Sequence, residues 1–268
     1  MVLSVPEWLA AVDADKAKLD AARPLTPRAL TLLRDTLIRA GTHRANAIGR
    51  AAPTPGETRV VLEGVTLGGK SLREHCEATN HCEALSYVEE IVANHEPLSV
   101  WQIRNLHNLV LKGGAGQEAC RYRHENVAIA GASTTPPDFL DLPAELAALV
   151  DWYANAGAMH PVVRAAELHT RFVKIHPYVD GNGRTGRLLL SVELMKSGYP
   201  PVVIRSEDRR AYCDALDDAC VSGDFAGITR LVAESVGRSL GIYLDALGLR
   251  ADVDVSGPLQ PGPDGTDT

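Results

Sequence analysis

The sequence predicts an all-α fold, a helical bundle with one small β-hairpin. Apolar residues recur at helical spacing in many segments, and most of these segments begin at capping residues. Only residues 121–129 combine β-forming residues with a central turn, at His124 to Asn126, which predicts two short strands. The chain has 268 residues, 45% of them hydrophobic, which is enough for one large domain or two small ones.

Four helices are predicted in the first half of the chain. Proline at the first helical position marks one start, and a Ser followed three residues later by an acid or amide marks two others. Residues 49–57 hold two prolines and two glycines and are expected to be irregular. The helices are expected around Trp8, from Thr26-Pro27, from Ser71 to about Asn94, and from Ser99 to about Lys112.

Five helices are predicted in the second half. They are expected from Pro143, from Pro161 to Ile175, from Arg184 to about Ser197, from Ser206, and from Asp224 to about Leu247. Residues 252–268 are rich in Asp, Gly and Pro and are expected to be disordered. We therefore divide the chain into an N-terminal helical region (1–59), a core domain (60–248) and a tail (249–268).

Composition excludes several classes of protein. The net charge of −7 argues against nucleic acid as the main partner, because binding to phosphate backbones rests on a basic surface. No run of about 18 apolar residues predicts a membrane span, and the first residues lack the pattern of a signal peptide. We expect a cytoplasmic protein with reduced thiols at its five cysteines, which are Cys76, Cys82, Cys120, Cys213 and Cys220.

Residues 176–187 carry the strongest functional signal. His176 can accept a proton near neutral pH, and the carboxylate of Asp180 can hold Mg²⁺. Gly181 and Gly183 allow backbone N–H groups to approach phosphate oxygens. Because a helix is expected to begin just after these glycines, its N-terminus would also attract an anion. The segment therefore predicts phosphoryl chemistry at a hydroxyl.

Two details of this segment follow from spacing. Pro177 is expected to hold His176 in an extended conformation and to end the preceding helix. Arg184 and Arg187 are three residues apart, so they share one face of the following helix, where arginines match phosphate geometry. The alternative is a structural Gly-Asn-Gly turn with solvated arginines, but the nearby base and carboxylate favour a functional loop.

Other candidate sites are weaker. His75-Cys76 and His81-Cys82 are six apart on a predicted helix, so the pairs point in different directions and do not match zinc-site spacings. His107 and His169 are interpreted as packed helix histidines, although His169 could support the floor of the site. A set of acids, Asp214, Asp217 and Asp218, is interpreted as a solvated face.

From His176 to Arg187 the sequence resembles the Fic family, whose signature is H-x-F-x-[DE]-G-N-G-R-x-x-R. Every signature position matches except Tyr178, where Phe is usual. The resemblance extends over roughly residues 60–245. It implies a protein adenylyltransferase, which moves AMP from ATP to a Ser, Thr or Tyr hydroxyl of a target protein. A relative that transfers phosphate instead carries Lys at the position of Gly183.

The resemblance also implies a role for each signature residue. His176 is the base, Asp180 the Mg²⁺ ligand, and Gly181 to Gly183 the anion hole. Asn182 and Arg184 hold phosphates, and Arg187 reaches the γ-phosphate. In this family the hairpin is a flap that aligns the target by strand addition, which assigns target binding to Val127, Ala128 and Ile129.

Two alternatives to this activity stay open. The same fold could transfer UMP, GMP or phosphocholine, or could modify a small molecule. The chain could also bind a nucleotide or a partner without chemistry.

Many Fic proteins carry an inhibitory helix reading [ST]-x-x-x-E-[GN], whose glutamate pairs with the second signature arginine. Here the Ser position is Ala45 and the Glu position is Gly49, so no carboxylate is available for Arg187. Glu63 is the nearest substitute, at the wrong spacing from Thr58. We therefore expect no intrinsic self-inhibition, unless a separate partner protein supplies the glutamate.

Overall fold

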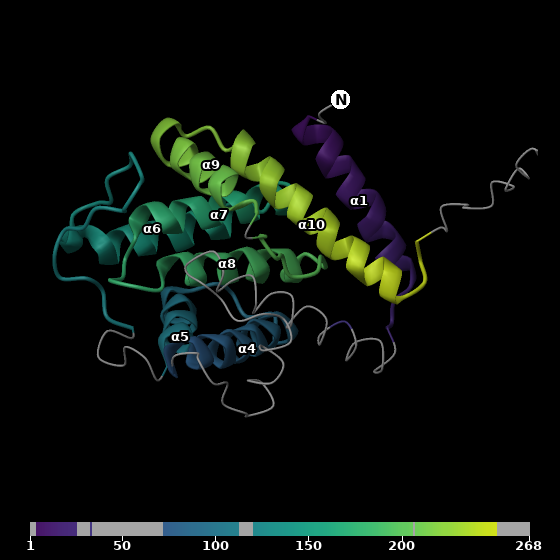
Figure 1. The fold of residues 1–268 in the computed structure, drawn as a ribbon, viewed down its shortest axis with the longest axis horizontal. Coiled ribbons are helices and arrows are strands. Elements are labelled where there is room, and N and C mark those ends of the chain that lie inside the picture. Colours follow the sequence, from purple (N-terminus) through teal and green to yellow (C-terminus); the bar gives the residue numbers. More distant parts are fainter. Residues whose placement is uncertain (1–3, 26–32, 34–71, 113–119, 206, 251–268) are drawn as a thin grey trace, which may run out of the picture.

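The computed structural model describes residues 4–25, 33, 72–112, 120–205 and 207–250, and its regular structure there is entirely helical (Figure 1). This confirms the predicted all-α class. The helices are α1 (Val5–Ala21), α4 (Leu72–Ala93), α5 (Val100–Leu111), the 3₁₀ turn η1 (Phe139–Asp141), α6 (Leu142–Asn155), α7 (Pro161–Ile175), α8 (Asn182–Lys196), α9 (Arg209–Ser222) and α10 (Ala226–Ala246).

Helices α7 and α8 lie side by side at the centre of the molecule, between two hydrophobic clusters (Figure 1). In the first cluster, α4, α5 and α6 pack against α7 and α8; its members include Leu106, Leu146, Phe172 and Leu189. In the second, α1, α9 and α10 pack against the same pair; its members include Val12, Ala165, Leu194 and Val236. Burial on two sides therefore fixes the helices that flank residues 176–181.

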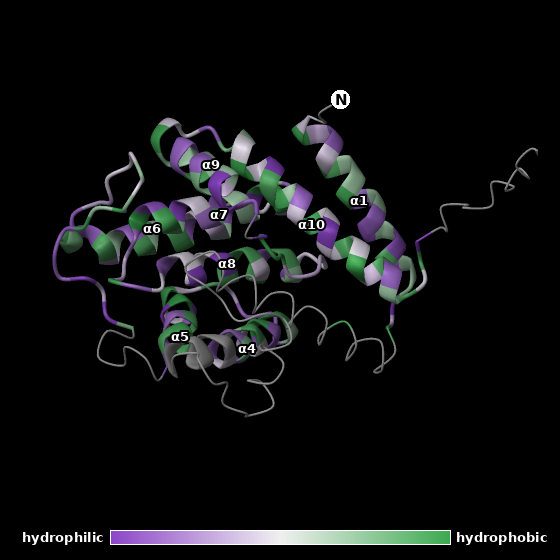
Figure 2. Cartoon of the chain, in the orientation of Figure 1, coloured by the Kyte–Doolittle hydropathy of each residue, from purple (hydrophilic) through white to green (hydrophobic). Residues whose placement is uncertain are grey.

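Figure 2 shows that hydrophilic and hydrophobic residues both occur around α1 and α10. Val12 and Leu19 on α1 are fully buried in the second cluster with Leu240 of α10. Such a stripe on one face of a helix is stable only when another element covers it. Among the described residues, no helix is long and apolar enough to cross a membrane.

The predicted capping residues act at several helix starts. Ser99 Oγ accepts the backbone N–H of Gln102 at 3.3 Å and begins α5. Asp224 accepts the N–H of Ala226 at 2.9 Å just before α10. The start of α9 differs from the prediction, because the helix begins at Arg209 and Asp208 precedes it. Asp208 instead pairs with Arg238 of α10 at 2.8 Å, which ties the helix start to its neighbour.

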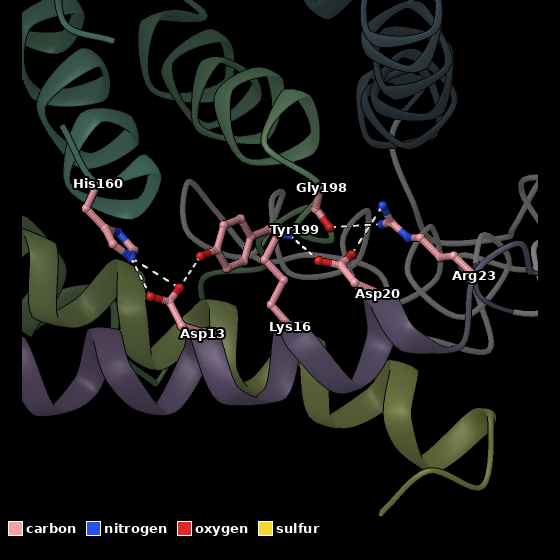
Figure 3. A network of polar contacts seen from close by, with 7 residues as sticks. All are labelled: Asp13, Lys16, Asp20, Arg23, His160, Gly198 and Tyr199. Carbon is pink, nitrogen blue, oxygen red and sulfur yellow. Dashed lines mark hydrogen bonds and ion pairs between the residues drawn. The ribbon is translucent and has the colours of Figure 1, made fainter. Parts of the chain in front are cut away.

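Polar contacts join α1 to the far ends of α7 and α8 (Figure 3). The carboxylate of Asp13 accepts the hydroxyl proton of Tyr199 and lies 3.2 Å from Nε2 of His160. Just after the end of α1, Nη2 of Arg23 donates to the carbonyl of Gly198 at 2.9 Å. His160 precedes α7, and Gly198 and Tyr199 follow α8. These contacts therefore hold together the two helix ends that lie opposite the 176–181 loop.

Residues 121–129 do not form the predicted hairpin. This segment contains no strand, and its turn lies later, where the N–H of Ala132 donates to the carbonyl of Ile129 at 3.1 Å. Gly131 takes a φ of 79° within that turn, a conformation that glycine adopts without steric cost. The backbone N–H of Arg123 donates to Pro177 rather than to a facing strand.

Several predictions fall outside the described residues. They are the helix from Thr26, the inhibitory positions Ala45 and Gly49, the substitute Glu63, and the tail beyond residue 250. The division at residues 59 and 248 stays a prediction.

Candidate active site

The loop between α7 and α8 begins at His176, which ends α7 in a left-handed conformation (φ 48°, ψ 57°). The helix stops before Pro177, as predicted, but His176 is not extended. Its N–H donates to the carbonyl of Phe172 at 3.1 Å and closes the last turn. Its own carbonyl accepts Nε–H of Arg123 at 3.0 Å. A non-glycine residue in this region costs roughly 1–2 kcal/mol, and these two bonds help to maintain it.

The imidazole of His176 is held in one tautomer. Nδ1 lies 3.3 Å from the carbonyl of Val173, which can only accept, so Nδ1 carries the proton and Nε2 does not. Burial and the charge of Arg123 lower the pKa of His176 below its usual 6.5, although the Val173 carbonyl opposes them. The ring is therefore neutral at pH 7 and its Nε2 can accept a proton.

Asp180 lies where the loop meets α8. Its Oδ1 accepts the N–H of Gly181 at 2.7 Å and lies 3.4 Å from Nη2 of Arg184. Gly181 is the N-cap of α8 with φ 85°, and a Cβ there would come within 3.1 Å of the His107 ring. The side chain of Asp180 is 47% exposed. A half-exposed carboxylate thus stands beside a helix N-terminus, which favours anions.

Arg187 lies between the start of α8, at Gly183, and the hydroxyl of Tyr212. A Cβ on Gly183 would lie 3.3 Å from Nη1 of Arg187, so the guanidinium passes close over the start of α8. A hydrogen bond from Arg187 to the Tyr212 hydroxyl opposes the burial that raises the pKa of Tyr212. The same hydroxyl lies 2.5 Å from Nε2 of His169. Because an arginine only donates, Tyr212 accepts from Arg187 and donates to His169.

His169 is a buried residue at the floor of the site. Burial lowers the pKa of His169 to about 3, so the ring is neutral and can accept from Tyr212. Its Nδ1 faces Gly186, where a Cβ would come within 2.8 Å. The sequence suggested that His169 is a packed helix histidine or a support for the floor of the site. It is both, since it is packed in the core and also supports Arg187 through Tyr212.

Asn182 is buried, and its side chain binds the loop rather than facing outward. Its Oδ1 accepts the N–H of Tyr178 at 3.1 Å, and its Nδ2 donates to the Tyr178 carbonyl at 2.7 Å. The amide thus closes the loop in both directions. The ring of Tyr178 is fully buried, and its hydroxyl has no hydrogen-bond partner in the part of the chain that the structure describes.

His107 of α5 contacts the loop at Tyr178 and Asp180. Its ring stacks on Tyr178 with centroids 3.6 Å apart and planes 4° apart. Nδ1 accepts the N–H of Cys120 at 3.2 Å, so Nε2 carries the proton and donates to the carbonyl of Asp180 at 2.9 Å. Burial lowers the pKa of His107 to about 4, which keeps this neutral tautomer. Sequence reasoning treated His107 as packing alone and missed this contact.

Arg123 is the other residue that sequence reasoning missed. Its side chain is buried, although it lies in an irregular loop. Besides the carbonyl of His176, it donates to the carbonyls of Glu125 at 2.9 Å and Pro137 at 2.6 Å. The one local signal was that Arg123 stood inside a predicted strand, and this does not by itself indicate burial.

Of the two histidine–cysteine pairs of α4, only His81-Cys82 has side chains within the described part of the chain. There, no three His, Cys, Asp or Glu side chains gather as metal ligands would. The side chains of His75 and Cys76 lie outside the described residues. Burial and the charges of Arg187 and Arg184 lower the pKa of His81 to about 4, so His81 lies near the signature arginines.

Comparison with known proteins agrees with this arrangement. The profile of the Fic/DOC family matches residues 97–194. Protein adenylyltransferase Fic of Nematostella vectensis is 36% identical over 75% of this chain and 48% of its own length. Protein adenylyltransferase fic-1 of Caenorhabditis elegans is 34% identical over 74% of this chain and 39% of its own. The chain thus spans half or less of these relatives.

Solved structures match over more of their length. A fragment of Fic-1 from C. elegans superposes with a TM-score of 0.82 and 30% identity, covering 91% of this chain and 73% of that one. A Fic domain containing signaling protein from Bacteroides thetaiotaomicron gives a TM-score of 0.81 at 28% identity, covering 90% and 98%. The fold, the loop between α7 and α8 and these relatives together show that the chain belongs to the Fic/DOC family.

Proposed function

We propose that the protein is an adenylyltransferase that moves AMP from ATP to a hydroxyl group of a target protein. The observation that carries this proposal is the tautomer of His176. Its Nδ1 is bound to the Val173 carbonyl, so Nε2 is unprotonated, and the loop that begins at His176 leads into the N-terminus of α8. The names of the relatives, which are protein adenylyltransferases, support the same activity.

In the proposed reaction, Nε2 of His176 takes the proton of the target hydroxyl as its oxygen attacks the α-phosphorus of ATP. The new bond joins that oxygen to AMP, and pyrophosphate leaves with the electron pair of the broken P–O bond. A general base with a pKa near the working pH is effective because it is unprotonated before the step and accepts readily during it. The lowered pKa of His176 keeps the base unprotonated at neutral pH.

The start of α8 would hold the phosphates. The backbone N–H groups of residues 181–183 supply donors, and Arg184 and Arg187 supply charge. Donors that are already in position stabilise the charge that develops in the transition state. Because the amide of Asn182 is engaged with Tyr178, we assign phosphate binding at that position to its main-chain N–H.

Asp180 fits the Mg²⁺ that ATP would bring. Mg²⁺ keeps several of its waters and takes one or two protein carboxylates together with phosphate oxygens. A single half-exposed carboxylate beside the helix N-terminus suits that role. When bound, Mg²⁺ would neutralise charge on the phosphates and on the leaving pyrophosphate.

The segment Val127–Ile129 would align the target. Val127 and Ile129 are half-buried and Ala128 is exposed, which is the alternation of an extended segment. An extended segment without a neighbouring strand can bind a peptide through its main chain.

The experiment is incubation of the purified chain with ATP labelled at the α-phosphate, in the presence of cell lysate and Mg²⁺. Transfer of label to protein, with release of pyrophosphate, supports the proposal. The His176→Ala variant is the control, and it should bind ATP but transfer no label. Mass spectrometry after incubation with UTP, GTP or CDP-choline separates the alternatives. Adducts from one of these donors, and none from ATP, would overturn the assignment of AMP.

A further inference from the structure

The irregular loop of residues 120–138, which we call the flap loop, has two limbs joined by a turn. The turn at residues 129–132 separates a first limb (121–129) from a second limb (132–138). The loop contains the proposed target-binding segment in its first limb. Its shape therefore decides where a target peptide would lie relative to His176.

The base of the flap loop is fixed by Arg123 and Asn126. Arg123 joins the two limbs, since it donates to Pro137 as well as to His176. Asn126 also bridges them, accepting the N–H of Phe139 at 2.9 Å and donating to Asp138 at 2.9 Å. These contacts lie at the end of the flap loop near the catalytic residues. They do not reach the turn at residues 129–132, at the opposite end.

Asp217 of α9 supports that other end. Its two carboxylate oxygens lie 2.9 and 2.8 Å from the backbone nitrogen of Ser133, and Oδ1 lies 3.1 Å from that of Thr134. Ser133 and Thr134 follow the turn directly. These hydrogen bonds lower the pKa of Asp217, so the carboxylate is ionised at neutral pH. Asp217 therefore lies on the solvated face that the sequence predicts and, in addition, binds the flap loop, which the sequence did not indicate.

The first limb lies between the contacts of Arg123 and Asn126 at the base and the contacts of Asp217 after the turn, and part of its backbone makes no hydrogen bond. Among the described residues, no hydrogen bond involves the backbone of Val127 or Ala128. Asp217 holds the second limb and not the first, so it supports the segment without occupying its donors and acceptors. A carboxylate that accepts two adjacent backbone N–H groups forms charge-assisted bonds, which are stronger than neutral ones.

We propose that Asp217 is a positioning residue for the protein target. By binding Ser133 and Thr134, it keeps the flap loop against α9 and sets the distance between the Val127–Ala128 edge and His176. Asp217 thereby governs transfer of AMP to a protein hydroxyl and takes no part in holding ATP. This inference rests on the proposed function. It adds that Asp217 helps to determine whether a protein target is accepted.

The first test is amide hydrogen exchange on the full chain. Asp217→Ala removes both acceptors, whereas Asp217→Asn keeps one carbonyl oxygen. We expect exchange at Ser133 and Thr134 to rise about tenfold in the alanine variant and by less in the asparagine variant. Asp218→Asn is the matched control, because Asp218 is the next residue on α9 and, among the described residues, its carboxylate makes no hydrogen bond or ion pair with the flap loop. Unchanged exchange in Asp217→Ala overturns the proposal.

The second test separates target acceptance from ATP chemistry. Each variant is incubated with ATP and, as the protein acceptor, a His176→Ala copy of this chain. Transfer to that acceptor and hydrolysis of ATP to AMP are measured together. We expect the ratio of transfer to hydrolysis to fall about tenfold in Asp217→Ala and to stay at the wild-type value in Asp218→Asn. A parallel fall of both rates in Asp217→Ala would show a general structural role and overturn the proposal.

The two tests also distinguish this inference from the proposed function. If the wild-type chain neither transfers AMP nor hydrolyses ATP, the proposed function fails. The exchange measurement would still decide whether Asp217 positions the flap loop.

Discussion

The guanidinium of Arg123 and the backbone of His176 are joined by a hydrogen bond of 3.0 Å between Nε and the carbonyl oxygen. The flap loop and the proposed base are therefore positioned by the same buried side chain, which is 2% exposed. A change at Arg123 should affect folding and catalysis together. The first prediction follows from this contact.

Arg123→Lys should destabilise the protein by about 2–3 kcal/mol, because lysine cannot reach the separate carbonyls of His176, Glu125 and Pro137, and charged hydrogen bonds are lost. Urea denaturation measures the change, and the turnover number for transfer should fall as well. Arg121→Lys, at an exposed position of the same limb, is the control. Equal stability of the two variants would contradict this role for Arg123.

The rate of transfer should be independent of pH above about 6.5 and should fall at lower pH. The pKa of His176 is lowered from 6.5, so the neutral base persists below that value before protonation removes it. The unfolded chain would bind this proton more readily, so the contribution of His176 to stability decreases as the pH falls below 6.5. A pH–rate profile checks the prediction, and an acid limb centred above 7 would contradict it.

Gly183→Ala should raise the KM for ATP several-fold while the fold is kept. The new Cβ would lie 3.3 Å from Nη1 of Arg187 and would displace that guanidinium. Gly227→Ala, where the Cβ meets only Ala215 at 3.5 Å, is the matched control. Steady-state kinetics with varied ATP measure the effect. An unchanged KM would show that the position of Arg187 does not limit ATP binding.

Tyr212→Phe should cost about 1–3 kcal/mol of stability, because His169 Nε2 would be buried without a donor. It should also weaken ATP binding, since Arg187 loses the hydroxyl that accepts from it. Tyr243→Phe on α10 serves as the comparison. Thermal unfolding and calorimetric titration with ATP provide the two measurements. Loss of stability with unaltered ATP affinity would remove Tyr212 from the phosphate site.

Gly49→Glu, with Ala45→Ser, should reduce transfer about ten- to hundredfold by giving Arg187 a carboxylate partner. This prediction rests on the sequence, because both positions lie outside the described residues. Glu63→Gly is the comparison and should leave the rate unchanged. A sharp rise in activity from Glu63→Gly, with no effect of Gly49→Glu, would show that Glu63 supplies the inhibitory glutamate.

The helices were largely predictable because their signals are local. Caps and prolines mark the starts, so α5 follows Ser99 and α7 has the expected bounds of Pro161 and Ile175. The loop with His176 and Asp180 was also predictable, since its residues are adjacent in the chain. The start of α9 was less predictable, because Asp208 is held by Arg238 thirty residues later.

The supports of the site could not be predicted, because they depend on contacts between distant segments. Arg123 reaches a carbonyl 53 residues away, and His107 reaches one 73 residues away. The left-handed conformation of His176 also depends on such contacts, which outweigh the local preference before proline. A sequence pattern shows the chemistry of a side chain, whereas its hydrogen-bond partners are determined by the packed fold.

The contacts of α1 bear on how far the chain can be shortened. Val12 and Leu19 cover apolar residues of α10, and Asp13 binds both His160 and Tyr199. Removing residues 1–59, the boundary that the sequence suggests, would uncover this face and leave Tyr199 without its acceptor. A shortened chain of that kind should aggregate during expression, because a contiguous exposed apolar surface promotes self-association. Shortened versions intended for crystallisation should therefore retain α1.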